Sequence, residues 1–129
     1  MLKKLFILIL IVAVIAFASI PMWTSYIADS AFKKPELPDA PEMIDKAIRL
    51  KMYFYMYSDA RKIAEKAVIY FPESTFTPGY MYSAGLCAEK EKNYDAAIIW
   101  YEKFLERYPK HSWAGATKNA LEKLKGIYK

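Results

Sequence analysis

Two patterns of hydrophobic residues divide the chain. Residues 5–20 form an apolar run that only Ser19 interrupts, and Lys3 and Lys4 precede it. From residue 41 onward, apolar and small residues recur at steps of three and four, which places them on one face of an α-helix. The patterns therefore predict an all-α protein, in which an N-terminal transmembrane helix precedes a short α-solenoid of two helical hairpins and a C-terminal capping helix.

The N-terminal run reaches the length of a membrane span when its flanks are counted. Residues 5–20 cover about 24 Å at ~1.5 Å per residue, whereas residues 2–23 cover about 33 Å, enough for a hydrocarbon core of ~30 Å. Trp23 and Tyr26 would then lie at the far interface as aromatic anchors. We therefore favour residues 1–23 as a retained transmembrane anchor of a single-pass membrane protein.

A cleaved signal peptide is the alternative, because residues 16–18 (Ala-Phe-Ala) fit the small-x-small cleavage pattern. Cleavage there would release a soluble periplasmic protein. Under either interpretation, Lys3 and Lys4 favour a cytoplasmic N-terminus with the C-terminal domain on the extracytoplasmic (periplasmic) side. Lys33 and Lys34 on the other side of the run weaken that bias.

Residues 24–40 are expected to form a proline-containing linker. Residues 24–32 could continue the first helix, but Pro35, Pro38 and Pro41 recur at every third position, the period of a polyproline II segment. Nine such residues at ~3.1 Å each would give a semi-rigid spacer of about 28 Å. A docking strip for a partner is the alternative interpretation of the same prolines.

Residues 78–111 carry the clearest helical hairpin. Gly85 and Ala88 fall on one face of a first helix and allow a close approach, and Asp95 can cap the second helix. Pro109 cannot continue a helix, so it ends the unit. The inward face of the second helix is predicted to hold Ala97, Tyr101 and Phe104.

The same features occur 37 positions earlier in the chain. Pro72 precedes Pro109 by 37 positions, and the Glu-Lys pair at residues 65–66 recurs at residues 102–103. Residues 41–74 therefore predict a first hairpin of the same kind. Its second helix is predicted to turn inward the three alanines Ala60, Ala64 and Ala67.

The run Met-Tyr-Phe-Tyr-Met-Tyr at residues 52–57 is apolar or aromatic all the way round a helix. One stripe is expected to pack within the first hairpin, and the opposite stripe then needs cover from another element. The neighbouring repeat, a second copy of the chain, the transmembrane helix or a partner could supply that cover.

Residues 112–129 predict a closing helix with Ser112 as its N-cap and a lysine-rich polar face. A polar terminal helix of this kind keeps a repeat array soluble. Its predicted apolar positions are Trp113, Ala116, Ala120, Leu124 and Ile127.

The spacing of small and large residues in residues 41–111 resembles the tetratricopeptide repeat (TPR) family, a 34-residue helix-turn-helix unit. Residues 112–128 resemble the capping helix of that family. The ending in Phe or Tyr followed by Pro is similar to the variant found in bacterial envelope proteins, although no lipobox cysteine occurs near the N-terminus.

The resemblance implies that the concave surface grips an extended or helical peptide from a partner protein. By position, that groove would be lined by Asp45, Arg49, Met52, Tyr53, Tyr82, Leu86, Glu89 and Lys90, with Trp113 and Ala116 from the capping helix. Residues Ile99 and Trp100 are predicted to face outward on the convex side and form the alternative partner-binding surface.

Catalytic and cofactor-binding patterns are missing from the sequence. His111 is the only histidine and Cys87 the only cysteine, and the four glycines form no phosphate-binding loop. The net charge of +5 is modest and dispersed, unlike the concentrated basic patch of a nucleic-acid-binding protein. We therefore expect a non-enzymatic protein without cofactor, metal or nucleic-acid partner.

The expected function is protein–protein interaction or scaffolding at the extracytoplasmic membrane face. The partners would be membrane or envelope complex subunits, the N-terminal helix would contact membrane lipid, and oligomerisation is compatible with the pattern. The alternative function is that of a permanent accessory or structural subunit in a larger membrane complex.

Overall fold

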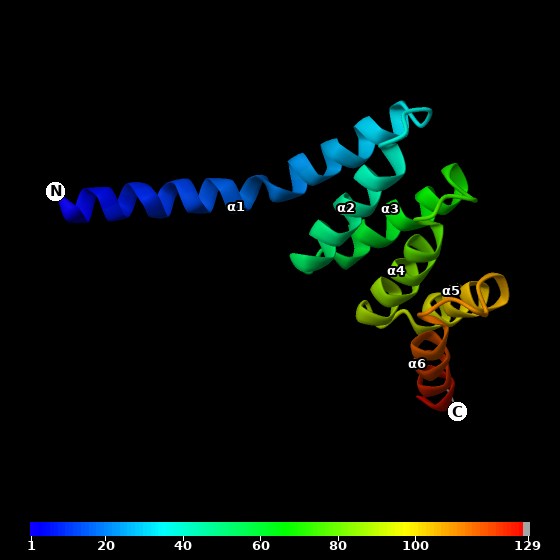
Figure 1. The fold of residues 1–129 in the computed structure, drawn as a ribbon. Helices are drawn as coiled ribbons and strands as arrows, with labels where there is room; N and C mark the ends of the chain where they lie inside the picture. Colours follow the sequence, from blue (N-terminus) through cyan, green and yellow to red (C-terminus); the bar gives the residue numbers. More distant parts are fainter. Residues whose placement is uncertain (128–129) are drawn as a thin grey trace.

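The computed structural model describes residues 1–127, which are helical and contain no β-strand (Figure 1). The predicted all-α class is thus confirmed for these residues. The helices are α1 (Leu2–Lys33), α2 (Ala40–Tyr53), α3 (Tyr57–Tyr70), α4 (Thr77–Lys90), α5 (Tyr94–Arg107) and α6 (Ala114–Ile127).

Helix α1 has two halves with different surroundings. Most of its first half projects from the rest of the molecule (Figure 1), and large apolar side chains such as Phe6, Val12 and Phe17 are more than half exposed. An 18-residue window of α1 has a mean hydropathy of 2.9. By length and composition α1 can therefore cross a membrane, and a signal sequence would have the same properties.

The second half of α1 is part of the folded array. Thr24, Ala28 and Ala31 are buried where α1 packs against α2, and Phe32 is also buried, with its ring centroid 5.0 Å from that of Tyr70 in α3. Residues 24–33 thus continue the first helix, as was considered for residues 24–32, but they also pack in the core, which was not expected of a linker.

A fully buried lysine adds a polar contact between the same helices. The Lys51 ammonium of α2 donates to the Ser25 hydroxyl of α1 at 3.0 Å and lies 3.8 Å from a carboxylate oxygen of Asp59 in α3. Because a buried ammonium needs such partners, Lys51 fixes how α1, α2 and α3 meet.

The predicted polyproline II spacer is wrong. Residues 34–39 form two successive turns, in which the Leu37 N–H donates to Lys34 O at 3.2 Å and the Ala40 N–H donates to Leu37 O at 3.1 Å. The chain therefore reverses, and α2 packs back on α1. Proline fixes φ near −65°, which suits turns and the first turn of a helix as well as an extended spacer. The spacing of the prolines therefore could not distinguish a chain reversal from a polyproline II spacer.

The helix bounds recur with a spacing of 37 residues. Helices α2, α4 and α6 begin at residues 40, 77 and 114, and α3 and α5 begin at residues 57 and 94. The ends of α1, α3 and α5 at Lys33, Tyr70 and Arg107 follow the same spacing. Helix α1 contacts α2 as α3 contacts α4 and as α5 contacts α6. The second half of α1 therefore takes the place of a second helix of a preceding hairpin.

The predicted interior faces of α3 and α5 are buried. Gly85 allows α4 and α5 to approach closely, since a Cβ atom at this position would lie 2.6 Å from two ring carbons of Tyr101. The six predicted inward residues, all fully buried, are Ala60, Ala64 and Ala67 in α3 with Ala97, Tyr101 and Phe104 in α5.

The helix starts differ from the expected ones. Asn93, not Asp95, caps α5, because its side-chain oxygen accepts from the Ala96 N–H at 3.4 Å. Helix α6 begins at Ala114, so Ser112 lies two residues before its first residue. Its buried stripe is also shifted from the predicted one: Ala116 is exposed, and the stripe consists of Thr117, Leu121 and Leu124. The predicted end of the capping helix at residues 128–129 and the side chain of Ile127 lie outside the part that the structure describes.

Candidate protein-binding surface

The groove residues predicted in the two hairpins occupy equivalent positions on α2 and α4. Each residue of α2 has its counterpart 37 positions later, so the same face of both helices is involved. The pairs are Asp45 with Tyr82, Arg49 with Leu86, Met52 with Glu89 and Tyr53 with Lys90.

The first halves of α2 and α4, together with the turn before α6, bring Asp45, Tyr82 and Trp113 together beside Gly79. A Cβ atom at Gly79 would lie 3.7 Å from Asp45 Oδ1 and 3.9 Å from Trp113 Cζ3. The ring centroid of Trp113 lies 5.5 Å from that of Tyr82. Sequence reasoning missed Gly79, because a small residue in the first turn of a helix has no distinctive pattern.

Asp45 and Arg49 form the polar side of this cluster. Asp45 is 8% exposed, and its carboxylate accepts from Arg49 Nε at 3.0 Å. Burial raises the pKa of Asp45, an effect that Arg49 opposes and the charge of Glu42 adds to. The Arg49 side chain is 68% exposed, so its remaining donors face solvent and can bind a further acceptor.

Aromatic rings form the apolar side of the cluster. The Tyr82 ring lies 6.0 Å from that of Tyr101 and 6.2 Å from that of Phe104. His111 lies 5.0 Å from the Trp113 ring, and its Nδ1 accepts from the Trp113 N–H at 3.1 Å. The Trp113 indole is 40% exposed, and its contacts with Tyr82 and His111 hold it in place. The sequence gave no sign of the contact between His111 and Trp113.

The remaining groove residues lie towards the other ends of α2 and α4. Eight residues of helix, about 12 Å, separate Asp45 from Tyr53. Tyr53 is 76% exposed and its ring packs 5.1 Å from that of Phe54, while Lys90 is exposed at the end of α4. Met52, Leu86 and Glu89 are half-buried. Ala116 is exposed on α6. The predicted groove thus divides into an aromatic cluster around Gly79 and a separate region at the helix ends.

The alternative convex surface also divides. Ile99 is 50% exposed, as expected, but Trp100 is half-buried between α3 and α5. Its indole N–H donates to Glu65 Oε1 at 3.1 Å, and the Lys103 ammonium lies 4.8 Å from the ring centroid. The expectation that Trp100 faces outward is therefore wrong, because Glu65 offers its indole N–H a partner inside the array.

Glu65 belongs to an ion-pair network that joins the two hairpins. Arg61 of α3 pairs with Glu65 at 3.2 Å and with Glu91, which follows α4, at 2.7 Å. Burial alone would lower the pKa of Arg61, but its bonds to Glu91 and Glu65 raise it above the ordinary value. This part of the convex side is therefore structural.

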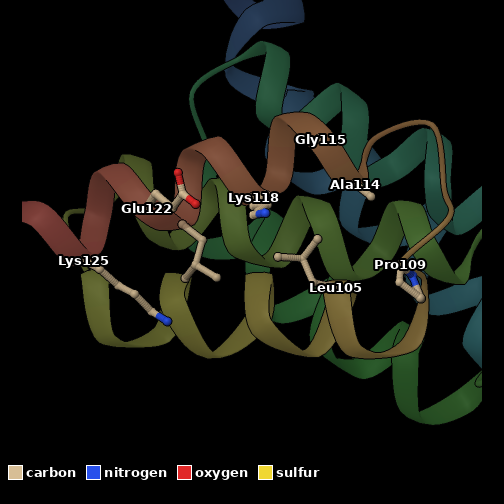
Figure 2. Close-up of a pocket in the computed structure, with 8 residues that line it drawn as sticks. Leu105, Pro109, Ala114, Gly115, Lys118, Glu122 and Lys125 are labelled. Atoms are coloured by element: carbon tan, nitrogen blue, oxygen red, sulfur yellow. The ribbon is translucent and has the colours of Figure 1, made fainter.

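A cleft lies between α5 and α6, at the C-terminal end of the array (Figure 2). Its volume is about 560 Å³, and Leu105 and Pro109 line it from the α5 side. On α6, Lys118, Glu122 and Lys125 take the positions that Met81, Gly85 and Ala88 hold on α4, as the 37-residue spacing shows. These charged side chains give α6 a solvated outer face where α4 has a packed one.

The thiol of Cys87 is held in its protonated form. Cys87 is fully buried, and burial together with the charge of Glu91 raises the pKa of its thiol to about 12. The thiolate that a nucleophile or metal ligand requires is therefore not formed near neutral pH. Among residues 1–127, no three His, Cys, Asp or Glu side chains are grouped as a metal site would need.

Comparison with protein-family models, with curated proteins and with solved structures gives no match to this chain.

Proposed function

We propose that this chain is a non-enzymatic, single-pass membrane protein whose TPR-like array binds another protein. Two hairpins, α2–α3 and α4–α5, and the capping helix α6 would form the array, with the partner in the groove lined by α2 and α4. The 37-residue spacing of the helices and the buried small residues at their contacts support this proposal.

The aromatic cluster around Gly79 carries the proposal. Gly79 has no side chain that could cover the neighbouring Trp113 indole, which is 40% exposed and offers an apolar surface. Tryptophan side chains of this kind dominate the affinity of many interfaces. The exposed Arg49 guanidinium at the edge of the site would bind a carboxylate of the partner. An extended or helical peptide with one apolar and one acidic side chain fits this surface.

Isolation of the full chain in mild detergent, followed by mass spectrometry of the co-purified proteins, tests the proposal. Arg49→Ala and Trp113→Ala should reduce recovery of the partner, because both side chains are exposed on the groove. Ile99→Ala, a substitution of an exposed residue on α5, is the matched control and should leave recovery unchanged. Equal recovery from all three variants would reject the groove as the binding surface.

A permanent accessory or structural subunit of a membrane complex is the second candidate. The exposed apolar side chains Ile69 (77%) and Ile99 (50%), on the second helices of the two hairpins, favour it. If this candidate is correct, Ile99→Ala and Ile69→Ala should lower the cellular level of the protein, whereas Trp113→Ala should not.

The proposed topology places the N-terminus in the cytoplasm and the array on the extracytoplasmic, periplasmic side. A cleaved signal peptide and a soluble periplasmic protein form the alternative. The intact mass of the protein from membranes distinguishes them: a mass that includes Lys3 and Lys4 supports the retained anchor, and a new N-terminus near Ser19 supports cleavage.

A further inference from the structure

The turn between α2 and α3 exposes aromatic side chains. Tyr53 is 76% exposed and Tyr55 is 79% exposed, with Phe54 half-buried between them. Tyr55 has a φ of 62°, in the left-handed region where a bulky side chain is uncommon. The turn therefore carries large apolar surface at a place where glycine or asparagine would be the ordinary choice.

The equivalent turn between α4 and α5 has the same backbone and the opposite chemistry. Lys92, 37 positions after Tyr55, has a φ of 63°. The Met56 N–H donates to Lys51 O at 2.8 Å, and the Asn93 N–H donates to Ala88 O at 2.9 Å. Yet the sequence is Tyr-Phe-Tyr-Met at residues 53–56 and Lys-Glu-Lys-Asn at residues 90–93. The aromatic residues are therefore not needed to form the turn.

The position of the aromatic turn relative to α1 distinguishes it from the charged one. The Phe54 ring lies 6.0 Å from that of Phe17, which belongs to the apolar first half of α1. Together with Met52, these aromatic side chains line an open groove of about 510 Å³ between the turn and α1. The charged turn belongs to the next hairpin, which packs on α3 rather than on α1 (Figure 1).

The level of Phe17 along α1 places the turn at the membrane. A hydrocarbon core of ~30 Å that begins after Lys4 would extend for about twenty residues, to near Thr24. Phe17 lies about seven residues, or ~10 Å, inside that limit. A turn beside Phe17 thus lies below the headgroup boundary, in the outer third of the hydrocarbon layer, where apolar aromatic side chains are tolerated and charged residues are not.

The backbone of the turn is suited to this environment. The N–H groups of Phe54, Tyr55 and Met56 all donate within the turn, to Leu50 O, Met52 O and Lys51 O. These three N–H groups therefore need no water as a partner, which lowers the cost of placing the turn in lipid.

We propose that the aromatic turn at residues 53–56 inserts into the near leaflet of the same bilayer that α1 crosses. The array is then held against the membrane at two points, the span itself and the turn. This inference rests on the proposed transmembrane anchor. The aromatic side chains of the turn would contact the lipids of the bilayer.

Spin labels in the full chain test the inference, after reconstitution without other proteins into vesicles of phosphatidylcholine and phosphatidylglycerol. One label is attached at Tyr55→Cys and the matched control at Lys92→Cys, both in turns of equal geometry. The native Cys87 is buried with its pKa raised to about 12, so it should not compete for the label. The label at residue 55 should lose most of its relaxation by an aqueous nickel chelate and gain relaxation by oxygen, while the label at residue 92 should show the reverse.

A third label at Leu10→Cys separates failure of the inference from failure of the anchor. Leu10 lies in the apolar half of α1. A label that is shielded at residue 10 but open to nickel at residue 55 would overturn the docked turn and leave the anchor intact. Nickel access at both residues would overturn both proposals. Shielding of residue 55 in native membranes but not in the vesicles would assign the turn to a protein partner and reject lipid.

Discussion

Gly85 is the glycine at which an added Cβ atom would make the closest contact. A methyl group added there would lie 2.6 Å from Tyr101 Cδ1 and Cε1, and the Tyr101 ring is fully buried and cannot move aside freely. We expect Gly85→Ala to lower the free energy of unfolding by about 1–3 kcal/mol, the usual cost of overpacking. Urea unfolding of the full chain in detergent, followed by circular dichroism, measures the change.

Gly115 supplies the matched control for this substitution. It also lies within a helix, but a Cβ atom there meets nothing within 4 Å. Gly115→Ala should therefore stabilise the protein by about 0.5–1 kcal/mol through helix propensity alone. If Gly85→Ala leaves the protein as stable as Gly115→Ala does, close packing of α4 on α5 is not required.

Two buried tyrosines predict sensitivity to alkaline pH. Burial raises the pKa of Tyr80 and Tyr101 above the ordinary value of 10.0, with smaller contributions from Asp45 for Tyr80 and from Glu89 for Tyr101. The neutral phenols are favoured in the fold, so their contribution to stability is full below pH 10 and is lost as the pH rises above 10, where the unfolded chain releases these protons.

The melting temperature of the full chain in detergent should accordingly fall steeply above pH 10. Tyr101→Phe keeps the ring and removes the ionisable group, so the decrease should be shallower in this variant. Tyr80→Phe should also make it shallower, but it should lower stability at neutral pH as well, because the Tyr80 hydroxyl donates to Pro41 O. A Tyr101→Phe profile identical to that of the native protein would contradict this assignment.

Interior residues were more predictable than helix caps and surface contacts. Ala60, Ala97 and Gly85 could be placed because small residues at helical spacing are a local pattern. Asn93 and Thr117 were missed, since helix boundaries shift by one or two residues without changing the pattern. Gly79 beside Trp113 was missed for a different reason, because that contact joins residues that are far apart in the sequence.

At the scale of elements, α1 combines an apolar half, long enough with its flanks to span a membrane, with a half that packs as a core helix. The apolar run was recognised from the sequence, but its continuation into the array was assigned to a linker. Burial of Ala28 and Ala31 depends on the reversal of the chain at residues 34–39, and the three prolines fit that reversal and a polyproline II spacer equally well. Only the 37-residue spacing of the helix ends shows the second half of α1 as a member of the array.

Two fragments without the apolar run should therefore differ in stability. The fragment 20–129 keeps the second half of α1, whereas the fragment 39–129 loses it and uncovers the buried face of α2 that holds Ile44 and Ile48. Loss of the buried Phe32 side chain alone should cost about 1.5–3 kcal/mol. Thermal unfolding and light scattering should show a stable monomer for 20–129 and a less stable or aggregated 39–129. Equal melting temperatures would mean that α1 contributes nothing to the core.

At the scale of the whole molecule, the sequence predicted the helical class and the period but not how the candidate binding surface divides. The groove positions on α2 and α4 follow from the period, since equivalent residues lie 37 positions apart. The gathering of Asp45, Tyr82 and Trp113 around Gly79, and the internal role of Trp100, depend on contacts between hairpins. Such contacts are determined by the packing of the array, which local periodicity does not describe.

The unbroken course of α1 from its apolar half into the array has a mechanical consequence. A domain on a flexible tether can swing freely, and a pull on it does not reach the membrane as a torque. Here the Lys51–Ser25 contact and the buried face of α1 join the array directly to the helix. If α1 crosses a bilayer as proposed, a force on the candidate groove would act on the tilt of α1.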